Sequence, residues 1–214
     1  MRFSYNQITS LRRDVSAKLS PKRYLHTLGV EKSACYIGRF FEEVDISELS
    51  VAALLHDITK EYSLAEHFEL LKRHSIDTGL YDADVDAVLH SMTALYAVLE
   101  DFLQYATSNV LSAVKNHTLG SSDMSIFDEI IFIADYVEDG RTYPACIDVR
   151  ESLYRDLKSS KSKDDLYRAI HCAVVKSLEY TIASLRARGN KVHEQTAVTL
   201  NAFTVKLNCY EEKL

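Results

Sequence analysis

The sequence predicts an all-α protein, and three observations point to that class. The chain of 214 residues contains only 6 Gly and 2 Pro, so few positions interrupt regular structure. Its hydrophobic residues make up 47% of the chain and recur mostly at helical rather than strand spacing. No internal repeat, low-complexity tract or flexible linker divides the chain. We therefore expect a single domain over residues 1–214, a helical bundle with its core at residues 20–189.

The predicted helices follow the apolar periodicity, and several begin at recognisable caps. Ser20 and Pro21 suit the N-cap and the first position of one helix. Ser63 and Glu66 fit the capping box of another. Gly189 is expected to end the longest helix. In chain order, helices are expected over residues 21–40, 46–62, 64–74, 82–102, 109–117, 126–139 and 163–189, followed by a short irregular C-terminal tail rich in β-branched residues at 191–207.

Composition argues against several classes of protein. The net charge of −6 disfavours sequence-independent nucleic-acid binding, although a local positive site could still hold an anionic small molecule. No apolar run approaches the roughly 20 residues of a membrane span, and the N-terminus lacks the apolar segment of a signal peptide. The 4 cysteines are scattered without a C-x-x-C pair, as in a reduced protein. We expect a cytoplasmic protein without nucleic-acid or membrane partners.

The segment LLHDITKE, residues 54–61, places polar groups where an apolar helix runs inward. His56 and Asp57 follow two leucines directly, and an unpartnered buried carboxylate is strongly destabilising. A metal ion would satisfy both groups, because neutral imidazole and ionised carboxylate are good ligands. Asp135 presents the same problem within IIFIADYV, the most apolar stretch of the chain.

Further histidines could complete such a site. Any one of them alone would more often be an ordinary interior or surface histidine. Four imidazoles and two carboxylates exceed what one tetrahedral ion needs and suit two ions, with Asp57 bridging through its two oxygens. Ligation by nitrogen and oxygen without thiolate favours iron, manganese or zinc over copper(I). The expected ligands are His26, His56, Asp57, His90, His117 and Asp135.

Three cations could bring positive charge to this site. On a helix, Lys60 would share a face with Asp57, and Arg23 would share one with His26. Arg141 follows a predicted helix end, and its planar fork suits phosphate. Each of these cations could alone be an ordinary surface charge. Of the other histidines, His67 and His74 are expected to be solvated and His171 to lie in the core or at its boundary, whereas His193 in the tail is not assigned.

The order of these groups, His … His-Asp … His … His … Asp, resembles that of the HD-domain metal-dependent phosphohydrolases. Five segments, KRYLHTLGV, AALLHDITKE, NHTLG, IIFIADYVEDGRTYP and VHEQTAVTLN, further resemble the bacterial YqeK family over residues 23–201. This resemblance implies an all-helical HD domain, a dinuclear metal centre with iron the leading candidate, and symmetrical hydrolysis of diadenosine tetraphosphate to two ADP. It also implies that Lys60 matches a lysine of the family and that Thr118, Gly120, Arg141 and Tyr143 lie around the nucleotide. Together with the positions of the cations, this predicts catalytic roles for Lys60 and Asp57 and substrate contacts at Arg23 and Lys60 as well.

The reaction expected on this basis is attack of a metal-bridging hydroxide on an inner phosphorus, with Lys60 and Arg141 stabilising the developing charge. Two alternatives stay open. The chain could be an HD hydrolase acting on another nucleotide, such as a guanosine alarmone or a deoxynucleoside triphosphate. It could also be a non-catalytic nucleotide-binding regulatory module, which a complete set of ligands argues against. A homodimer is compatible with a small domain, but no sequence feature marks its interface.

Overall fold

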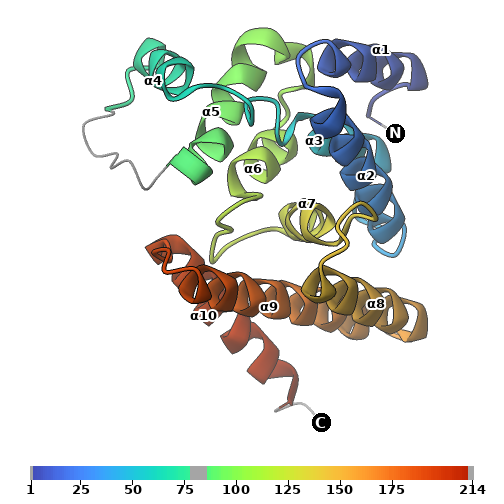
Figure 1. Ribbon diagram of the computed structural model, residues 1–214. Coiled ribbons are helices and arrows are strands. Elements are labelled where there is room, and N and C mark those ends of the chain that lie inside the picture. Colours follow the sequence, from blue (N-terminus) through green and yellow to red (C-terminus); the bar gives the residue numbers. More distant parts are fainter. Residues whose placement is uncertain (1, 78–85, 212–214) are drawn as a thin grey trace.

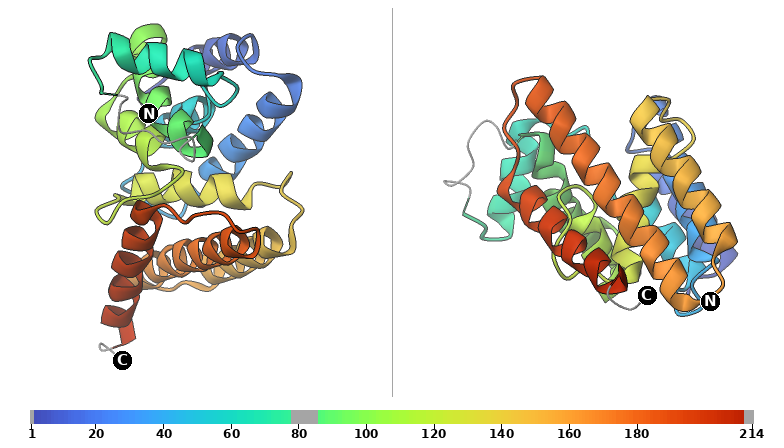
Figure 2. Two further views of the ribbon diagram at one scale, coloured as in Figure 1. Left: turned by 60° about the vertical axis from the view of Figure 1, so that its left-hand side comes forward. Right: turned by 90° about the horizontal axis from the view of Figure 1, so that it is seen from below.

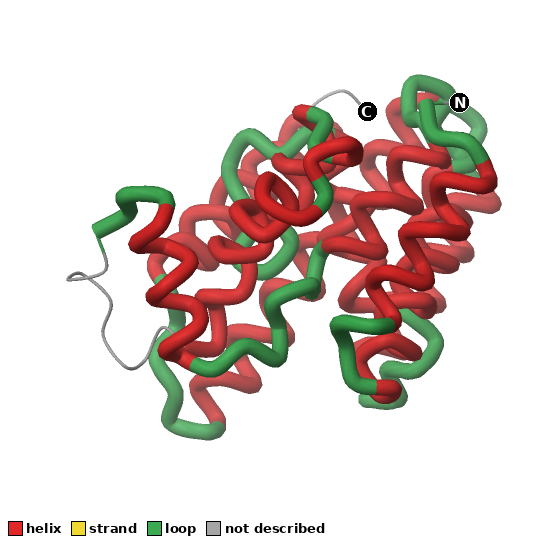
Figure 3. Tube along the Cα trace, turned by 90° about the horizontal axis from the view of Figure 1, so that it is seen from above, coloured by secondary structure: helices red, strands yellow, loops and turns green. Residues whose placement is uncertain are grey.

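The computed structural model describes residues 2–77 and 86–211, and most of these are helical. No strand occurs within these two ranges, so the predicted all-α class is confirmed (Figure 3). The elements are α1 (Tyr5–Ser16), α2 (Pro21–Gly38), α3 (Ile46–Leu55), α4 (Leu64–Arg73), α5 (Asp86–Asp101), the 3-10 helix η2 (Leu103–Tyr105), α6 (Ser108–Asn116), α7 (Ile126–Val137), α8 (Pro144–Ser159), α9 (Lys163–Ala187) and α10 (Glu194–Glu211).

Helix α7 lies at the centre of the arrangement (Figure 1). It contacts α2, α3 and α6, and it also contacts α8 and α9, which run below it in Figure 1. Helix α9 packs against both α8 and α10, and these three helices form one layer (Figure 2). Since apolar side chains cover most of its surface, α7 contributes to both parts of the buried core. No helix of the described chain is long and apolar enough to cross a membrane.

The predicted caps are present and explain where several helices begin and end. Ser20 accepts a hydrogen bond at the start of α2, with Pro21 at the first position. Ser63 and Glu66 form the reciprocal capping box predicted for α4. Gly189 lies just beyond α9 and has a φ of 73°, a backbone conformation that residues other than glycine rarely adopt. Local sequence therefore determines these boundaries.

The prediction of an irregular C-terminal tail is wrong, because α10 is a helix. Its Thr196, Thr199 and Phe203 are buried, and they lie on one helical face. Phe203 is 0% exposed and packs in a cluster that includes Val174 and Leu178 of α9. Burial of this face outweighs the weak preference of β-branched residues for extended chain.

Two further helices, α1 and α8, were not among the predicted elements. Both have ordinary start signals: Ser4 and Gln7 form a capping box for α1, and α8 begins at Pro144. The prediction of a solvated His67 is also wrong, because the residue is 2% exposed and its Nδ1 lies 2.8 Å from Thr93 Oγ1. The start of the predicted helix over residues 82–102 falls partly on positions 82–85, outside the described residues.

Candidate metal centre

The His-Asp pair lies where α3 ends, rather than inside a longer helix as predicted. His56 is the C-cap of α3, and Asp57 begins the turn that follows. The His56 ring donates from Nδ1 to the carbonyl oxygen of Ala53 at 2.7 Å, which satisfies a carbonyl at the helix end. His117 caps α6 in the same way, with its Nδ1 2.7 Å from the carbonyl oxygen of Val114. In both rings Nε2 is the remaining nitrogen, free of the backbone.

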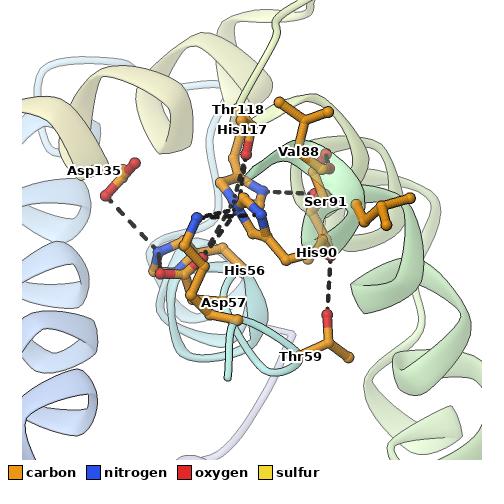
Figure 4. Close-up of polar contacts among 12 residues, drawn as sticks. His56, Asp57, Thr59, Val88, His90, Ser91, His117, Thr118 and Asp135 are labelled. Atoms are coloured by element: carbon orange, nitrogen blue, oxygen red, sulfur yellow. Dashed lines mark hydrogen bonds and ion pairs between the residues drawn. The ribbon is translucent and has the colours of Figure 1, made fainter. Parts of the chain in front are cut away.

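The structure brings the six predicted ligands together from α2, α3, α5, α6 and α7, and Figure 4 shows five of them converging. The two oxygens of Asp57 face different pairs of histidines. Oδ1 lies 3.4 Å from His90 Nε2 and 3.5 Å from His117 Nε2. Oδ2 lies 3.7 Å from His26 Nε2 and 3.5 Å from His56 Nε2. Asp57 therefore has the placement that the sequence analysis expected of a bridging carboxylate.

Asp135 joins the pair of histidines on the Oδ2 side. Its Oδ1 lies 3.0 Å from His26 Nε2 and 4.0 Å from His56 Nε2. Two sets of side chains have ligand atoms within 4.8 Å of one another, so each set could contact a single ion. These sets are His26, His56 and Asp135, and His56, Asp57 and His117.

The hydrogen bonding of these rings fits a metal ion. His26 Nε2 and His56 Nε2 are buried, and their contacts with the carboxylates of Asp135 and Asp57 lack hydrogen-bond geometry, whereas buried polar atoms normally have a hydrogen-bond partner. The Nε2 atoms of His90 and His117 lie 3.1 Å apart, so the two rings point at the same place. A cation that accepts lone pairs from neutral imidazoles and carboxylates would satisfy all four nitrogens.

Asp57, Asp135 and His90 are in the protonation states that bind metals. Burial opposes ionisation of Asp57, but the nearby imidazoles, that of His56 first, outweigh it and lower the pKa of Asp57 well below its usual value. Burial likewise opposes ionisation of Asp135, and Arg141, 2.6 Å from its Oδ1, lowers the Asp135 pKa. Burial lowers the pKa of His90 well below its usual value. Both carboxyl groups are therefore ionised and His90 is neutral near pH 7. At His26, burial lowers the pKa of the imidazole, but the nearby carboxylates of Asp135, Asp57 and Glu138 outweigh burial and raise it.

Arg23, Lys60 and Arg141 border the centre, as predicted. Arg23 Nη1 donates to Asp57 Oδ2 at 2.9 Å. Lys60 lies in the turn after α3, and its Nζ is 3.1 Å from each ring nitrogen of His90. Burial lowers the pKa of Lys60, while the carboxylates of the centre oppose that shift. Positive charge therefore approaches the centre from three different segments.

A cavity of about 1350 Å³ opens above the centre. Its volume exceeds the roughly 300–1,000 Å³ of sites for drug-sized ligands. Among its lining residues are five Lys or Arg and five Asp or Glu, so the protein alone brings no excess of positive charge. A polyphosphate bound there would need further positive charge, which divalent cations would supply. The cavity walls also include apolar and hydroxyl side chains of α7, α9 and α10, namely Phe132, Tyr136, Ser177, Leu178, Thr181 and Thr196.

Most of the predicted nucleotide contacts line this cavity. Thr118 Oγ1 lies 2.9 Å from His90 Nε2 and 3.0 Å from His117 Nε2, directly beside the centre. Tyr143 is 71% exposed, so its ring is free to contact a ligand. The predicted contacts found in the lining are Arg23, Lys60, Thr118, Arg141 and Tyr143.

Gly120 has a different place from the one expected. It is buried after α6 rather than in the cavity lining, and its φ is +69°. A Cβ at this position would lie 2.6 Å from Thr199 Cγ2. The glycine is therefore explained by its positive φ and by the close approach of α10.

One residue near the centre was missed in the sequence. Glu138 is 4% exposed, and its Oε1 lies 3.2 Å from His26 Nδ1. It follows directly on the apolar helix α7, three positions after Asp135. A second carboxylate at the end of so apolar a stretch could have been recognised by the argument that singled out Asp135.

The helical fold and the His/Asp centre define an HD-type protein, and comparison with known families agrees. The chain belongs to the HD domain family, which matches residues 23–140. The symmetrical bis(5'-nucleosyl)-tetraphosphatase of Staphylococcus aureus is 31% identical over 147 residues, which cover 69% of this chain and 74% of that protein. The enzyme of the same name from Halalkalibacterium halodurans is 30% identical over 189 residues, covering 87% and 91%.

A solved structure shows the same fold. It is the crystal structure of a predicted HD superfamily hydrolase involved in NAD metabolism from Clostridium acetobutylicum. The two structures superpose with a TM-score of 0.79 over 95% of this chain and 98% of the other, at 25% sequence identity. The family expected from the sequence motifs is thereby confirmed.

Proposed function

We propose that this protein hydrolyses diadenosine tetraphosphate, or a closely related dinucleoside polyphosphate, symmetrically to two nucleoside diphosphates. The names of its relatives bear out the enzyme class expected from the sequence. In the structure, one observation carries the proposal: four histidines and two aspartates converge at the base of a cavity with room for a dinucleotide.

The metal ligands in this proposal are the six residues predicted from the sequence. Two ions would share Asp57, one on the side of His26, His56 and Asp135, and the other on the side of His90 and His117. Iron is the leading candidate, with manganese or another transition metal as alternatives. When bound, such ions lower the pKa of a coordinated water and polarise phosphoryl oxygens.

The cations at the rim would act on the phosphates. Lys60 can donate to a phosphoryl oxygen that lies against the centre, because its ammonium already reaches His90. Arg141 donates from Nη2 to Asp135 and lines the cavity, so the other N–H groups of its guanidinium can donate to a ligand oxygen. Arg23 anchors Asp57 and faces the same cavity. These side chains would stabilise charge that develops on the leaving diphosphate.

The cavity also offers surfaces for the two nucleosides of the substrate, one at each end of the phosphate chain. Symmetrical cleavage requires that the second phosphorus from one end lies at the centre. Tyr136 of α7 offers a half-buried aromatic ring in the cavity lining. Tyr143 and Leu25, both largely exposed, offer an apolar surface elsewhere in the lining. Bases stack on such surfaces, which would hold the polyphosphate in register.

A panel of nucleotides tests the proposal against its alternatives. Manganese-loaded protein is mixed separately with diadenosine tetraphosphate, a guanosine tetraphosphate alarmone, deoxynucleoside triphosphates and cyclic nucleotides. We expect kcat/KM for the dinucleotide to exceed the others by about 100-fold or more, since only it fills both ends of the cavity. Preferred turnover of another nucleotide would assign a different HD hydrolase activity. Nucleotide binding without turnover of any substrate would favour the regulatory module.

Four wider expectations belong to the same proposal. We place the enzyme in the cytoplasm as one domain over residues 1–214, with a small-molecule nucleotide as its partner. A buried apolar cluster shared by α1 to α9 supports the single domain. A C2 homodimer is compatible with its size, and light scattering of the purified chain tests that state.

A further inference from the structure

Glu138 is buried beside the proposed centre, and both of its oxygens are engaged. Oε1 lies 3.2 Å from His26 Nδ1. Oε2 accepts a hydrogen bond from the backbone amide of Gly140 at 2.6 Å. The side chain is 5% exposed, so this carboxylate is held in one place rather than solvated.

His26 needs such a partner because of its position in α2. His56 and His117 stand at helix ends, where Nδ1 donates to a backbone carbonyl three residues earlier. His26 lies inside the helix, where the carbonyls before it accept hydrogen bonds from amides of the next turn. The backbone therefore offers its Nδ1 no acceptor, and the Glu138 carboxylate takes that place.

The surrounding backbone leaves room for this carboxylate and fixes it. A Cβ on Gly29 would lie 2.4 Å from Glu138 Oε2, and one on Gly140 would lie 2.9 Å from it. Arg150 Nη1 donates to the carbonyl oxygens of Val137 and Glu138, at 3.1 and 2.8 Å. The Arg150 contacts hold the turn after α7 against α8, and the turn places Glu138 beside His26 of α2.

We propose that Glu138 is a positioning residue that accepts a hydrogen bond from His26 Nδ1 and so directs His26 Nε2 into the metal centre. Because Gly29 has no side chain, it leaves the space that the Glu138 carboxylate occupies. The inference rests on the proposed function, because it takes His26 as a ligand. A carboxylate behind a ligating imidazole fixes the ring and strengthens it as a ligand, and losing such a partner typically weakens metal binding 10- to 100-fold.

Manganese binding to the full-length protein tests this role directly. Free Mn²⁺ is measured by electron paramagnetic resonance during titration of wild type, Glu138→Gln, Gly29→Ala and His26→Ala. Glu151→Gln on the exposed side of α8 is the matched control. We expect Glu138→Gln and Gly29→Ala to bind one Mn²⁺ about 10- to 100-fold more weakly and Glu151→Gln to bind as wild type. At saturating Mn²⁺, KM for the dinucleotide should be unchanged and kcat should largely recover.

The variants separate this inference from the proposed function. Wild-type affinity in Glu138→Gln, beside weakened binding in His26→Ala, would overturn the role of Glu138 alone. Wild-type affinity in His26→Ala would remove His26 from the metal site and contradict the proposed centre itself. If Glu138→Gln does not fold, the Mn²⁺ affinity of Gly29→Ala tests the role of Glu138 instead. This variant should fold, because alanine is favourable inside a helix.

Discussion

At the scale of single residues, the site depends on how each imidazole is held. His56 and His117 satisfy the backbone at the ends of two helices and present Nε2 to the same space. The sequence showed which residues these were, because a polar group inside an apolar segment requires a partner. The sequence could not show that Glu138 is the hydrogen-bond partner of His26, since this contact joins α2 to the turn after α7, and the two residues are 112 positions apart in the chain.

Lys60 is the residue whose loss should separate binding of metal from catalysis. Lys60→Ala removes a cation near the phosphates but no proposed ligand. We expect metal content to stay at the wild-type level and kcat to fall about 10²-fold, the scale of losing one donor to a developing oxyanion. Metal analysis and steady-state kinetics measure the two effects. Lys158→Ala, in the last turn of α8, is the control. Full turnover in Lys60→Ala would show that Lys60 has no role in catalysis.

At the scale of elements, local signals predicted helices where caps and apolar periodicity coincide, as in α2, α4 and α9. The end of α3 was predicted too late, because the residue that caps it is the same His56 that belongs to the centre. Helix α10 was missed because its helical state depends on packing against α9, which residues 191–207 alone do not encode.

Phe203 should report whether α10 is held by its buried face. Its ring is 0% exposed, so Phe203→Ala should lower the free energy of unfolding by about 3–5 kcal/mol through lost burial and a cavity. Val205→Ala, on a side chain that is 54% exposed, should change it by about 0.5 kcal/mol or less. Urea denaturation measures both. Equal effects of the two substitutions would contradict the packing of α10 described above.

Asp45 caps α3, the helix whose other end places His56 and Asp57. Its carboxylate accepts from the amides of Ser47 and Glu48 at 2.8 and 3.1 Å. Partial burial opposes ionisation of Asp45, but the hydrogen bond from the Ser47 hydroxyl, together with those from the two amides, outweighs burial and lowers the pKa from 3.8 to about 2. Because the folded-state pKa is depressed, the stabilisation is present above pH 3.8 and is lost as the pH falls towards 2.

Substitution of this cap therefore has a pH-dependent cost. Asp45→Ala should lower the free energy of unfolding by about 1 kcal/mol near neutral pH, and the difference from wild type should narrow as the pH falls below 3.8. Asp45→Asn retains a capping oxygen and should cost less at pH 7. Urea titrations at several pH values measure these differences, and a pH-independent cost for Asp45→Ala would refute the ionised cap.

At the scale of the whole molecule, the centre joins five helices that are distant in the sequence. Asp57 after α3 faces histidines from α2, α5 and α6, and Asp135 of α7 completes the set. The order of these residues along the chain was visible in the sequence. Their distances, the cavity of about 1350 Å³ and the packing of α8 and α9 against α7 arise only from tertiary structure.

A metal that ligates side chains from five helices should stabilise the entire fold. Ions that bind only the native state add about 2.7 kcal/mol to the free energy of unfolding at 100 times their Kd. We expect Mn²⁺ to raise the Tm of wild type and a chelator to reverse the rise. Asp57→Asn should show little or no increase, whatever its own metal-free Tm. An equal Mn²⁺-dependent rise in that variant would place the ion elsewhere.

The identity of the products tests the central claim most directly. Iron- or manganese-loaded protein, prepared without oxygen, is incubated with diadenosine tetraphosphate, and the nucleotides are separated by chromatography beside an Asp57→Ala control. Symmetrical hydrolysis at the proposed centre predicts ADP as the sole nucleotide product of the wild type and none from the control. AMP together with ATP, or equal ADP formation by Asp57→Ala, would contradict it.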